Sequence, residues 1–152
     1  MILHLGVVDI PYAGAPSANA PFKPFSGVTT TGDVATWLEN KYHVMEIFYH
    51  ANEDMIVNAI TDSYENTLRN MFAGSPVPNN PLKEAEAKIT ARFKDFLSRA
   101  EIEALGIPGV PTGAAKMGIN HRFKHPYAKA NPRRPSFIDT GLYQSTFVAW
   151  FD

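Results

Sequence analysis

Three consecutive residues near the end of the sequence, Asp139, Thr140 and Gly141, form the triplet that carries the catalytic carboxylate in aspartic proteases. Such a protease needs two triplets face to face, because its two carboxylates share one proton. A dimer of single-triplet chains satisfies this in retroviral enzymes, but those are almost entirely β. Here eleven residues follow Gly141 and helical patterns precede the triplet. We therefore expect no enzymatic role; an uncharacterised hydrolase built on Asp139 is the remaining enzymatic hypothesis.

The triplet also has a purely structural interpretation. Asp139 and Thr140 can each accept a hydrogen bond from a backbone amide two residues on, and Gly141 can adopt a positive φ at no steric cost. Together they would form a tight turn or a helix cap that directs the last strand into a sheet. We predict this structural role for the triplet.

Two histidines, His121 and His125, have a spacing that would bind a divalent metal if the segment were helical. Pro126 and the adjoining bases disfavour a helix there, and the local sequence holds no carboxylate to complete a ligand set. We expect no metal and no cofactor.

The charges divide unevenly along the chain. Residues 1–106 carry 8 basic and 13 acidic side chains, a balance of −5, and residues 107–152 carry 6 basic and 2 acidic, a balance of +4. Such a division favours head-to-tail association, because one surface complements the other. The six bases are interface or DNA-channel candidates, and aromatic residues lie among them: Lys116, Arg122, Lys124, Lys129, Arg133 and Arg134. We favour contact with an acidic neighbouring subunit over contact with a phosphate backbone.

The composition indicates one soluble domain, residues 1–152. A chain of 152 residues with 45% hydrophobic residues can bury one modest core. It has no cysteine, which excludes disulfides and thiolate metal sites. No apolar run reaches the length of a membrane span, so we expect no membrane contact and synthesis in a reducing cytoplasm.

The elements that must position these residues follow from local patterns. The opening MILHLGVV predicts a strand. Residues 11–30 hold four prolines and predict an extended arm or surface loop, whose aromatic side chains would contact the domain or a neighbour: Tyr12, Phe22 and Phe25.

Residues 31–106 predict about three amphipathic helices. Thr31 or Asp33 can cap the first, and a second follows, either after a break near Asn52 or as the continuation of one long bent helix. Apolar side chains on the second recur at Ile56, Ile60, Leu68 and Met71, with Gly74 as its stop. Asn80-Pro81 opens the third, whose stripe is Leu82, Ala85, Ile89, Phe93, Phe96 and Leu97. Ser98 with Glu101 predicts a capping box and a short helix ending at Gly106.

The last third of the chain predicts a long loop and a strand. Residues 107–135 show no sustained period and form a long basic loop, a type that is often functional or interfacial. Residues 136–152 predict the turn followed by a strand over Leu142–Phe151. The expected fold class is α+β, with a small, mostly antiparallel sheet or partial barrel carrying the helices.

The run RRPSFIDTGLYQSTFVAWFD resembles the C-terminal part of neck and tail-completion proteins of tailed bacteriophages. Further upstream, the run GVPTGAAKMGINHRFKHPYAKANPRRPSF resembles neck proteins of contractile-tailed phages. The matching positions are Pro135, Asp139, Thr140, Gly141, Leu142 and Ser145. Many relatives have a basic residue directly after the glycine, where this chain has Leu142.

The resemblance implies a virion structural protein that forms a homo-oligomeric ring, six-fold like the tail, in the neck between head and tail. The ring would complete or cap the tail and leave a channel for DNA. Its partners would be itself and the adjoining portal-adaptor, tail-tube or sheath proteins, with possible non-specific contact to genomic DNA. The alternative hypothesis is a small nucleic-acid-binding protein that uses residues 116–134.

Overall fold

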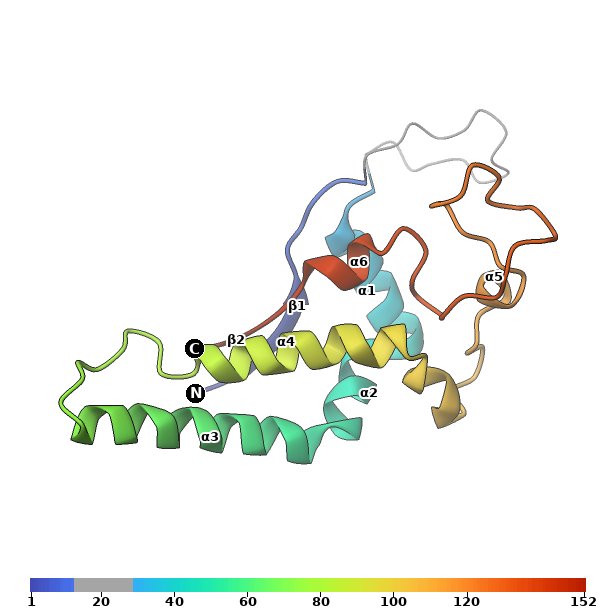
Figure 1. Ribbon diagram of the computed structural model, residues 1–152. Helices are drawn as coiled ribbons and strands as arrows, with labels where there is room; N and C mark the ends of the chain where they lie inside the picture. Colours follow the sequence, from blue (N-terminus) through green and yellow to red (C-terminus); the bar gives the residue numbers. More distant parts are fainter. Residues whose placement is uncertain (13–28) are drawn as a thin grey trace.

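The computed structural model describes residues 1–12 and 29–152, and its most prominent feature is a long helical hairpin that projects from one side of the molecule (Figure 1). The described residues are α+β and mostly helical, with six α-helices, one 3-10 helix and a two-stranded antiparallel sheet. The arm predicted for residues 11–30 lies largely outside the described residues, as do Phe22 and Phe25.

The sheet joins the two ends of the described chain. Strand β1 (Leu3–Val7) pairs with β2 (Phe147–Phe151) in antiparallel register, from Leu3 opposite Phe151 to Val7 opposite Phe147. The predicted N-terminal strand is confirmed. In the described part of the chain the sheet has two strands, so the alternative of a partial barrel is not found there.

A helix covers the outer edge of β2. Helix α4 (Lys83–Ser98) supplies Thr90, whose Oγ1 accepts from the Ala149 amide at 3.1 Å, and Glu86, whose Oε1 accepts from the Phe151 amide at 3.2 Å. These contacts satisfy strand amides that a two-stranded sheet leaves unpaired and protect the edge against pairing with other chains.

The first predicted helices are divided by two breaks instead of one. Helix α1 (Thr31–Tyr42) ends at His43, which has a φ of 51°, and α2 (Val44–Ala51) ends at Asn52. Asn52 is buried and donates its side-chain amide to the Phe48 carbonyl at 2.8 Å, and α3 (Glu53–Phe72) begins directly after it. The break near Asn52 was one of the two predicted alternatives; the break at His43 was not predicted.

The cap of α1 is Thr30, one residue before the predicted candidate Thr31 and three before the other, Asp33. Thr30 and Asp33 form a reciprocal capping box. Thr31 is fully buried instead, because its hydroxyl donates to the Val8 carbonyl at 2.7 Å and accepts from the Ile10 amide at 2.9 Å. Thr31 thereby ties the segment after β1 to the start of α1.

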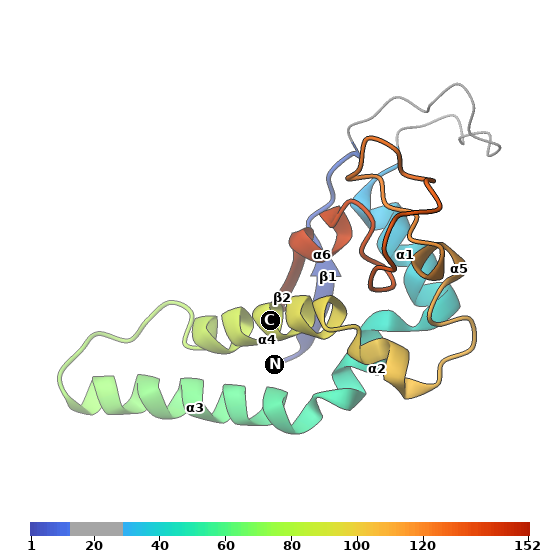
Figure 2. The same cartoon turned by 45° about the vertical axis from the view of Figure 1, so that its right-hand side comes forward.

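The projecting hairpin consists of α3 and α4, joined by residues 73–82 (Figures 1 and 2). The predicted stripe of α4 is buried at every position. The stripe of α3 is buried at Ile56 but is half-exposed at Leu68 and Met71, because α3 extends past the body of the protein. The hairpin tip therefore presents apolar side chains to solvent.

Four phenylalanines occupy the centre of the core, where α2, α4 and β2 meet. Phe93 stacks on Phe147 with ring centroids 3.7 Å apart, and Phe48 meets Phe93 edge-on at 5.1 Å. Phe96 packs edge-on against Phe48 at 5.6 Å. This cluster holds the C-terminal strand against the hairpin.

The predictions for two short elements in the last part of the chain need correction. The predicted short helix is a 3-10 helix, η1 (Glu101–Leu105), but Ser98 does not cap it; Ala100 occupies the cap position, with a φ of 56°. The predicted strand over Leu142–Phe151 begins only at Phe147, because Leu142–Thr146 forms helix α6. Helix α5 (Gly113–Lys116) is the short helical turn in an otherwise irregular segment from 107 to 135.

Candidate functional site

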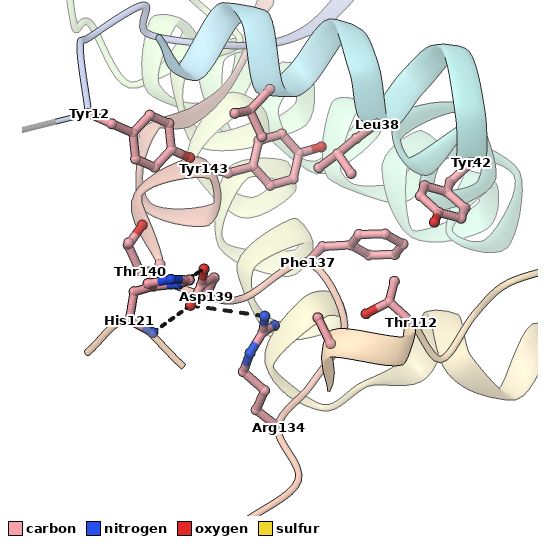
Figure 3. A pocket seen from close by; sticks show the side chains of 13 residues that line it. Tyr12, Leu38, Tyr42, Thr112, His121, Arg134, Phe137, Asp139, Thr140 and Tyr143 are labelled. Atoms are coloured by element: carbon pink, nitrogen blue, oxygen red, sulfur yellow. Dashed lines mark hydrogen bonds and ion pairs between the residues drawn. The ribbon is translucent and has the colours of Figure 1, made fainter. Parts of the chain in front are cut away.

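The Asp139 carboxylate is bound to His121, eighteen residues earlier in the chain (Figure 3). Its Oδ1 accepts from the His121 backbone amide at 2.7 Å, and its Oδ2 lies 2.5 Å from the His121 ring nitrogen Nδ1. The other ring nitrogen, Nε2, lies 3.1 Å from the Tyr127 hydroxyl. The carboxylate therefore fastens two segments of the long loop to each other, and its amide partner differs from the one that we predicted.

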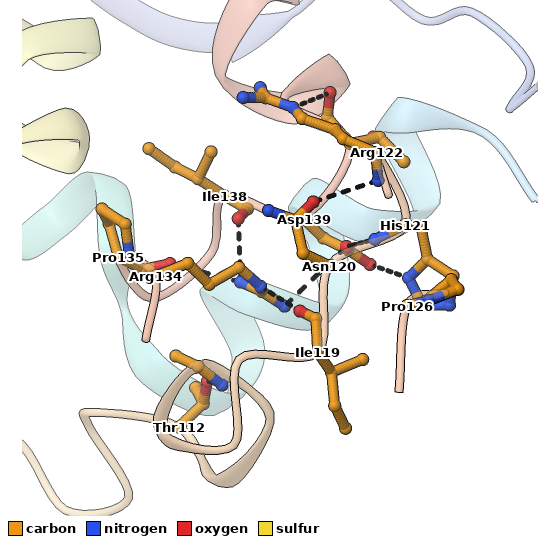
Figure 4. A network of polar contacts seen from close by, with 12 residues as sticks. Thr112, Ile119, Asn120, His121, Arg122, Pro126, Arg134, Pro135, Ile138 and Asp139 are labelled. Atoms are coloured by element: carbon orange, nitrogen blue, oxygen red, sulfur yellow. Dashed lines mark hydrogen bonds and ion pairs between the residues drawn. The ribbon is translucent and has the colours of Figure 1, made fainter. Parts of the chain in front are cut away.

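The enclosed side chain of Arg134 binds backbone groups of the same loop (Figure 4). Its side chain is only 10% exposed, and its guanidinium donates to the backbone carbonyls of Ile119, Pro135 and Ile138. One guanidinium thus joins two stretches of chain that have no regular secondary structure, the one at Ile119 and residues 134–138. Burial lowers the pKa of Arg134, while the nearby Asp139 carboxylate, 4.0 Å away, opposes that shift.

Thr140 and Gly141 begin helix α6. The Thr140 hydroxyl accepts from the Leu142 amide, two residues on, at 3.3 Å, and Gly141 has a φ of 82°. The Arg122 guanidinium donates to the Thr140 carbonyl at 2.9 Å, and a Cβ on Gly141 would lie 1.8 Å from that guanidinium. The Ser145 amide donates to the Gly141 carbonyl at 2.9 Å, which forms the first turn of the helix. The triplet therefore lies at the junction between the loop and the helix that leads into β2.

A second polar cluster attaches the loop to η1. The Glu103 Oε1 accepts from the Ser136 amide at 2.8 Å and from the Ser136 hydroxyl at 2.7 Å, while Oε2 is bound by Arg133. The Ser136 side-chain oxygen in turn accepts from the Thr112 amide at 3.1 Å. Ser136 is fully buried, so this cluster satisfies polar groups that have no access to water.

Glu103 gives the fold an acid-sensitive contact. Burial raises its pKa, but hydrogen bonds from Ser136 and the charge of Arg133 outweigh burial, so its pKa lies below the ordinary value of 4.5. A carboxylate with a depressed folded pKa stabilises the fold above its unfolded pKa, and that contribution is lost as pH falls through the folded pKa. We therefore expect the free energy of unfolding to decline below about pH 5.

Glu103→Gln should lower stability at pH 7 and flatten this decline, because glutamine does not titrate. Urea unfolding of both proteins at a series of pH values measures the effect, with the exposed Glu53→Gln as the control. If the Glu103→Gln and wild-type curves run parallel through the acid range, Glu103 is not the sensitive contact.

The loop and α1 enclose a cavity of about 520 Å³ (Figure 3). Its wall is mostly apolar and includes Val34, Leu38 and Tyr42 of α1 and Phe137 of the loop. Its polar groups are those of the loop and α6: Thr112, His121, Arg134, Asp139, Thr140 and Tyr143. Volumes of this size, with apolar walls and a few polar groups, are typical of binding pockets.

Two tyrosines, Tyr12 and Tyr143, line the cavity. Tyr143 is 2% exposed, and its hydroxyl has no hydrogen-bond partner among the described residues. Burial raises the pKa of Tyr143 well above its ordinary value of 10.0, so the phenol stays neutral and remains a hydrogen-bond donor. Burial also raises the pKa of Tyr12, the one predicted arm aromatic that the structure describes. The cavity thus holds a buried donor that needs an acceptor.

The six predicted bases separate into two groups. Arg122, Arg133 and Arg134 bind groups of the chain itself, and Arg134 is largely enclosed. Lys116, Lys124 and Lys129 are exposed, as are the neighbouring aromatics Phe123 and Tyr127. The surface that remains for a partner is therefore lysine-rich, with exposed aromatic rings between the charges.

One further group of side chains has ligand-like spacing. Among the described residues, Glu39, His43 and Glu46 bring three potential metal-ligand atoms within 4.8 Å of one another. The Glu39 carboxylate accepts from the amides of Met45 and Glu46 at 2.8 and 3.1 Å, which caps the start of α2 after the break at His43. Helix capping accounts for this arrangement.

The structure adds residues to the site that sequence reasoning missed: Tyr143 as a buried donor, Glu103 and Ser136 as a buried anchor, and His121 as the partner of Asp139. Burial within an irregular loop has no periodic signal, so no pattern marks these residues. Residues 107–135 contain basic and no acidic side chains, so the sequence did not indicate that three of the six, Arg122, Arg133 and Arg134, bind groups of the chain itself.

Comparisons with known proteins identify no relative: no family model, no curated protein and no solved structure matches this chain. None of the helices in the described part of the chain has the length and hydrophobicity needed to cross a bilayer.

Proposed function

We propose that the chain is a structural subunit of a tailed-bacteriophage neck, which forms a homo-oligomeric ring that completes the tail and joins it to the head. The observation that carries the proposal is the use of the Asp139 carboxylate. It is held by the amide and ring of His121 at 2.7 and 2.5 Å, at the junction that leads through α6 into β2. A carboxylate in this position supports the geometry of a turn, which is the role that the residue types of the triplet predict.

Assembly is the work that the rest of the molecule supports best. The long loop is rigidified by Arg134 and by the Glu103–Ser136 cluster, so it presents one fixed surface to a partner. The projecting hairpin presents a second, different surface. A ring in which every subunit makes the same contact requires two distinct complementary faces, one for each neighbour. The subunits would leave a central channel through which DNA passes.

The test is the presence of the chain in particles. An antibody or mass-spectrometric assay on purified virions of the phage that encodes it should detect the chain at a fixed, small number of copies per particle. Particles assembled without the chain should have heads and tails that do not join. Absence of the chain from purified virions would refute the proposal.

A second candidate function is supported by the exposed Lys124 and Lys129 with Tyr127 between them. Cations interleaved with exposed aromatic rings bind single-stranded nucleic acid without sequence preference. Filter binding across a salt series separates the two functions, because this one requires a steep salt dependence that falls when both lysines are neutralised. The variants to use are Lys124→Gln and Lys129→Gln, since Arg134 would perturb the loop itself.

A further inference from the structure

The most exposed large side chain at the tip of the hairpin is an aromatic one. Phe72, the last residue of α3, is 90% exposed, and Leu68, Met71 and Val77 are exposed beside it. Soluble proteins seldom leave a group of large apolar side chains open to solvent unless the group contacts something. The core does not need Phe72, so its exposure indicates a binding role.

The cavity beneath the Asp139 turn has the properties of a receptor for such a side chain. Its walls are apolar and aromatic, and its volume of about 520 Å³ is ample for one phenylalanine and part of the adjoining helical turn. Tyr143 lines the cavity, and among the described residues its buried hydroxyl has no hydrogen-bond partner. The last carbonyls of α3 already accept from the amides of residues 73–75, so the match between the hairpin tip and the cavity rests on apolar contact.

The two features cannot meet within one chain. The hairpin tip and the elements that line the cavity, α1 and α6, lie well apart in both views (Figures 1 and 2). They can meet only between copies, and a contact between two different surfaces repeats from copy to copy in one direction. This is the contact type that closes into a ring.

The charges of the two regions complement each other. The hairpin, residues 53–98, carries 7 acidic and 5 basic side chains, a balance of −2, whereas residues 107–135 beside the cavity carry 6 basic and no acidic ones. Opposite potentials speed the encounter and fix its orientation, and they disfavour contact between two hairpins or between two loops.

We propose that Phe72 of one copy inserts into the cavity between α1 and the loop of the next copy, so that the hairpin is the link between neighbouring subunits. The proposal rests on the proposed ring and names its contact. Aromatic side chains that fill a partner's pocket are the residues that contribute most to affinity in protein interfaces.

The absence of cysteine from the chain makes a direct test possible. Ala73→Cys, exposed directly beside the retained Phe72, and Ala114→Cys, in the cavity wall, are made separately, mixed in equal amounts and treated with a short bismaleimide. We expect a cross-linked heterodimer, and a ladder of covalent oligomers when both cysteines are in one chain. Val57→Cys is the matched control: it is 54% exposed on the same helix but about 22 Å from Phe72, and it should not cross-link to residue 114.

A second measurement uses the assembly itself. Phe72→Asp should weaken self-association by about thirty-fold or more, as expected for an aromatic anchor, while Val57→Asp leaves it unchanged. Circular dichroism verifies that both variants fold, since neither side chain is buried. An oligomer of unchanged mass with Phe72→Asp and no cross-link to residue 114 would overturn the hairpin contact and leave the ring intact. A wild-type chain that stays monomeric at every concentration would overturn both.

Discussion

Arg134→Met should destabilise the protein by about 2–4 kcal/mol, although the substitution removes a residue from a segment with almost no secondary structure. The guanidinium donates to the carbonyls of Ile119, Pro135 and Ile138 and is only 10% exposed. Removing it leaves those acceptors without their shared donor and removes the cation that lies 4.0 Å from the Asp139 carboxylate. Chemical denaturation monitored by tyrosine and tryptophan fluorescence gives the change in the free energy of unfolding.

The neighbouring Arg133 provides a matched control. Its side chain is 56% exposed and pairs with Glu103, which keeps its two bonds to Ser136 when Arg133 is lost. Arg133→Met should therefore cost less, about 1 kcal/mol, because the arginine is exposed and the enclosed Glu103 carboxylate keeps its hydrogen bonds from Ser136. Arg134→Lys should recover little, because an ammonium on a flexible stem cannot bridge three carbonyls in a fixed fork. Equal effects of the two arginine-to-methionine changes would contradict the structural role given to Arg134.

Phe93→Ala should destabilise the protein still more, by about 3–5 kcal/mol. Phe93 is fully buried, stacks on Phe147 at 3.7 Å and meets Phe48 edge-on at 5.1 Å. The change would leave a cavity at the point where α4 holds β2, so we expect both the helix packing and the sheet to weaken. Thermal and urea unfolding measure the loss.

Phe72→Ala tests whether this cost comes from burial and not from loss of an aromatic ring. Phe72 belongs to the same residue type but is 90% exposed, so its replacement should change the free energy of unfolding of the monomer by less than about 0.5 kcal/mol. A loss at Phe93 no larger than that at Phe72 would show that the phenylalanine cluster is not the centre of the core.

The helical hairpin was predictable because periodicity is strong where one face is buried. Every position of the α4 stripe from Leu82 to Leu97 is buried as expected. Its partner, α3, was predicted with a stripe that continues to Met71, yet that end is exposed. Periodicity reports which side chains share a face of a helix; it does not report whether another element covers that face.

Three features depended on local conformations that sequence patterns do not mark. His43 and Ala100 adopt left-handed φ values of 51° and 56° although neither is glycine, and each ends a helical segment there. The β-branched and aromatic character of Leu142–Phe151 predicted one strand, but the Gly141 turn opens a helix of five residues first. In the structure the triplet directly precedes α6, and α6 leads into β2.

The site itself was less predictable than the fold. Asp139 and His121 are eighteen residues apart, and Glu103 and Ser136 are thirty-three apart, in segments without a repeating pattern. Arg134 directly follows Arg133 in the sequence, and only the folded loop distinguishes an enclosed guanidinium from an exposed one. Such contacts arise from the path of the whole loop, which no local rule specifies.

Native mass spectrometry of the purified wild-type chain over a range of concentrations tests the central claim most directly. A self-closing ring subunit should give one dominant species with a mass that is a fixed multiple of 16.8 kDa, and that multiple should stay constant as the concentration rises. A spectrum that contains only the monomer at every concentration, or an open-ended series of ever larger species, would contradict it.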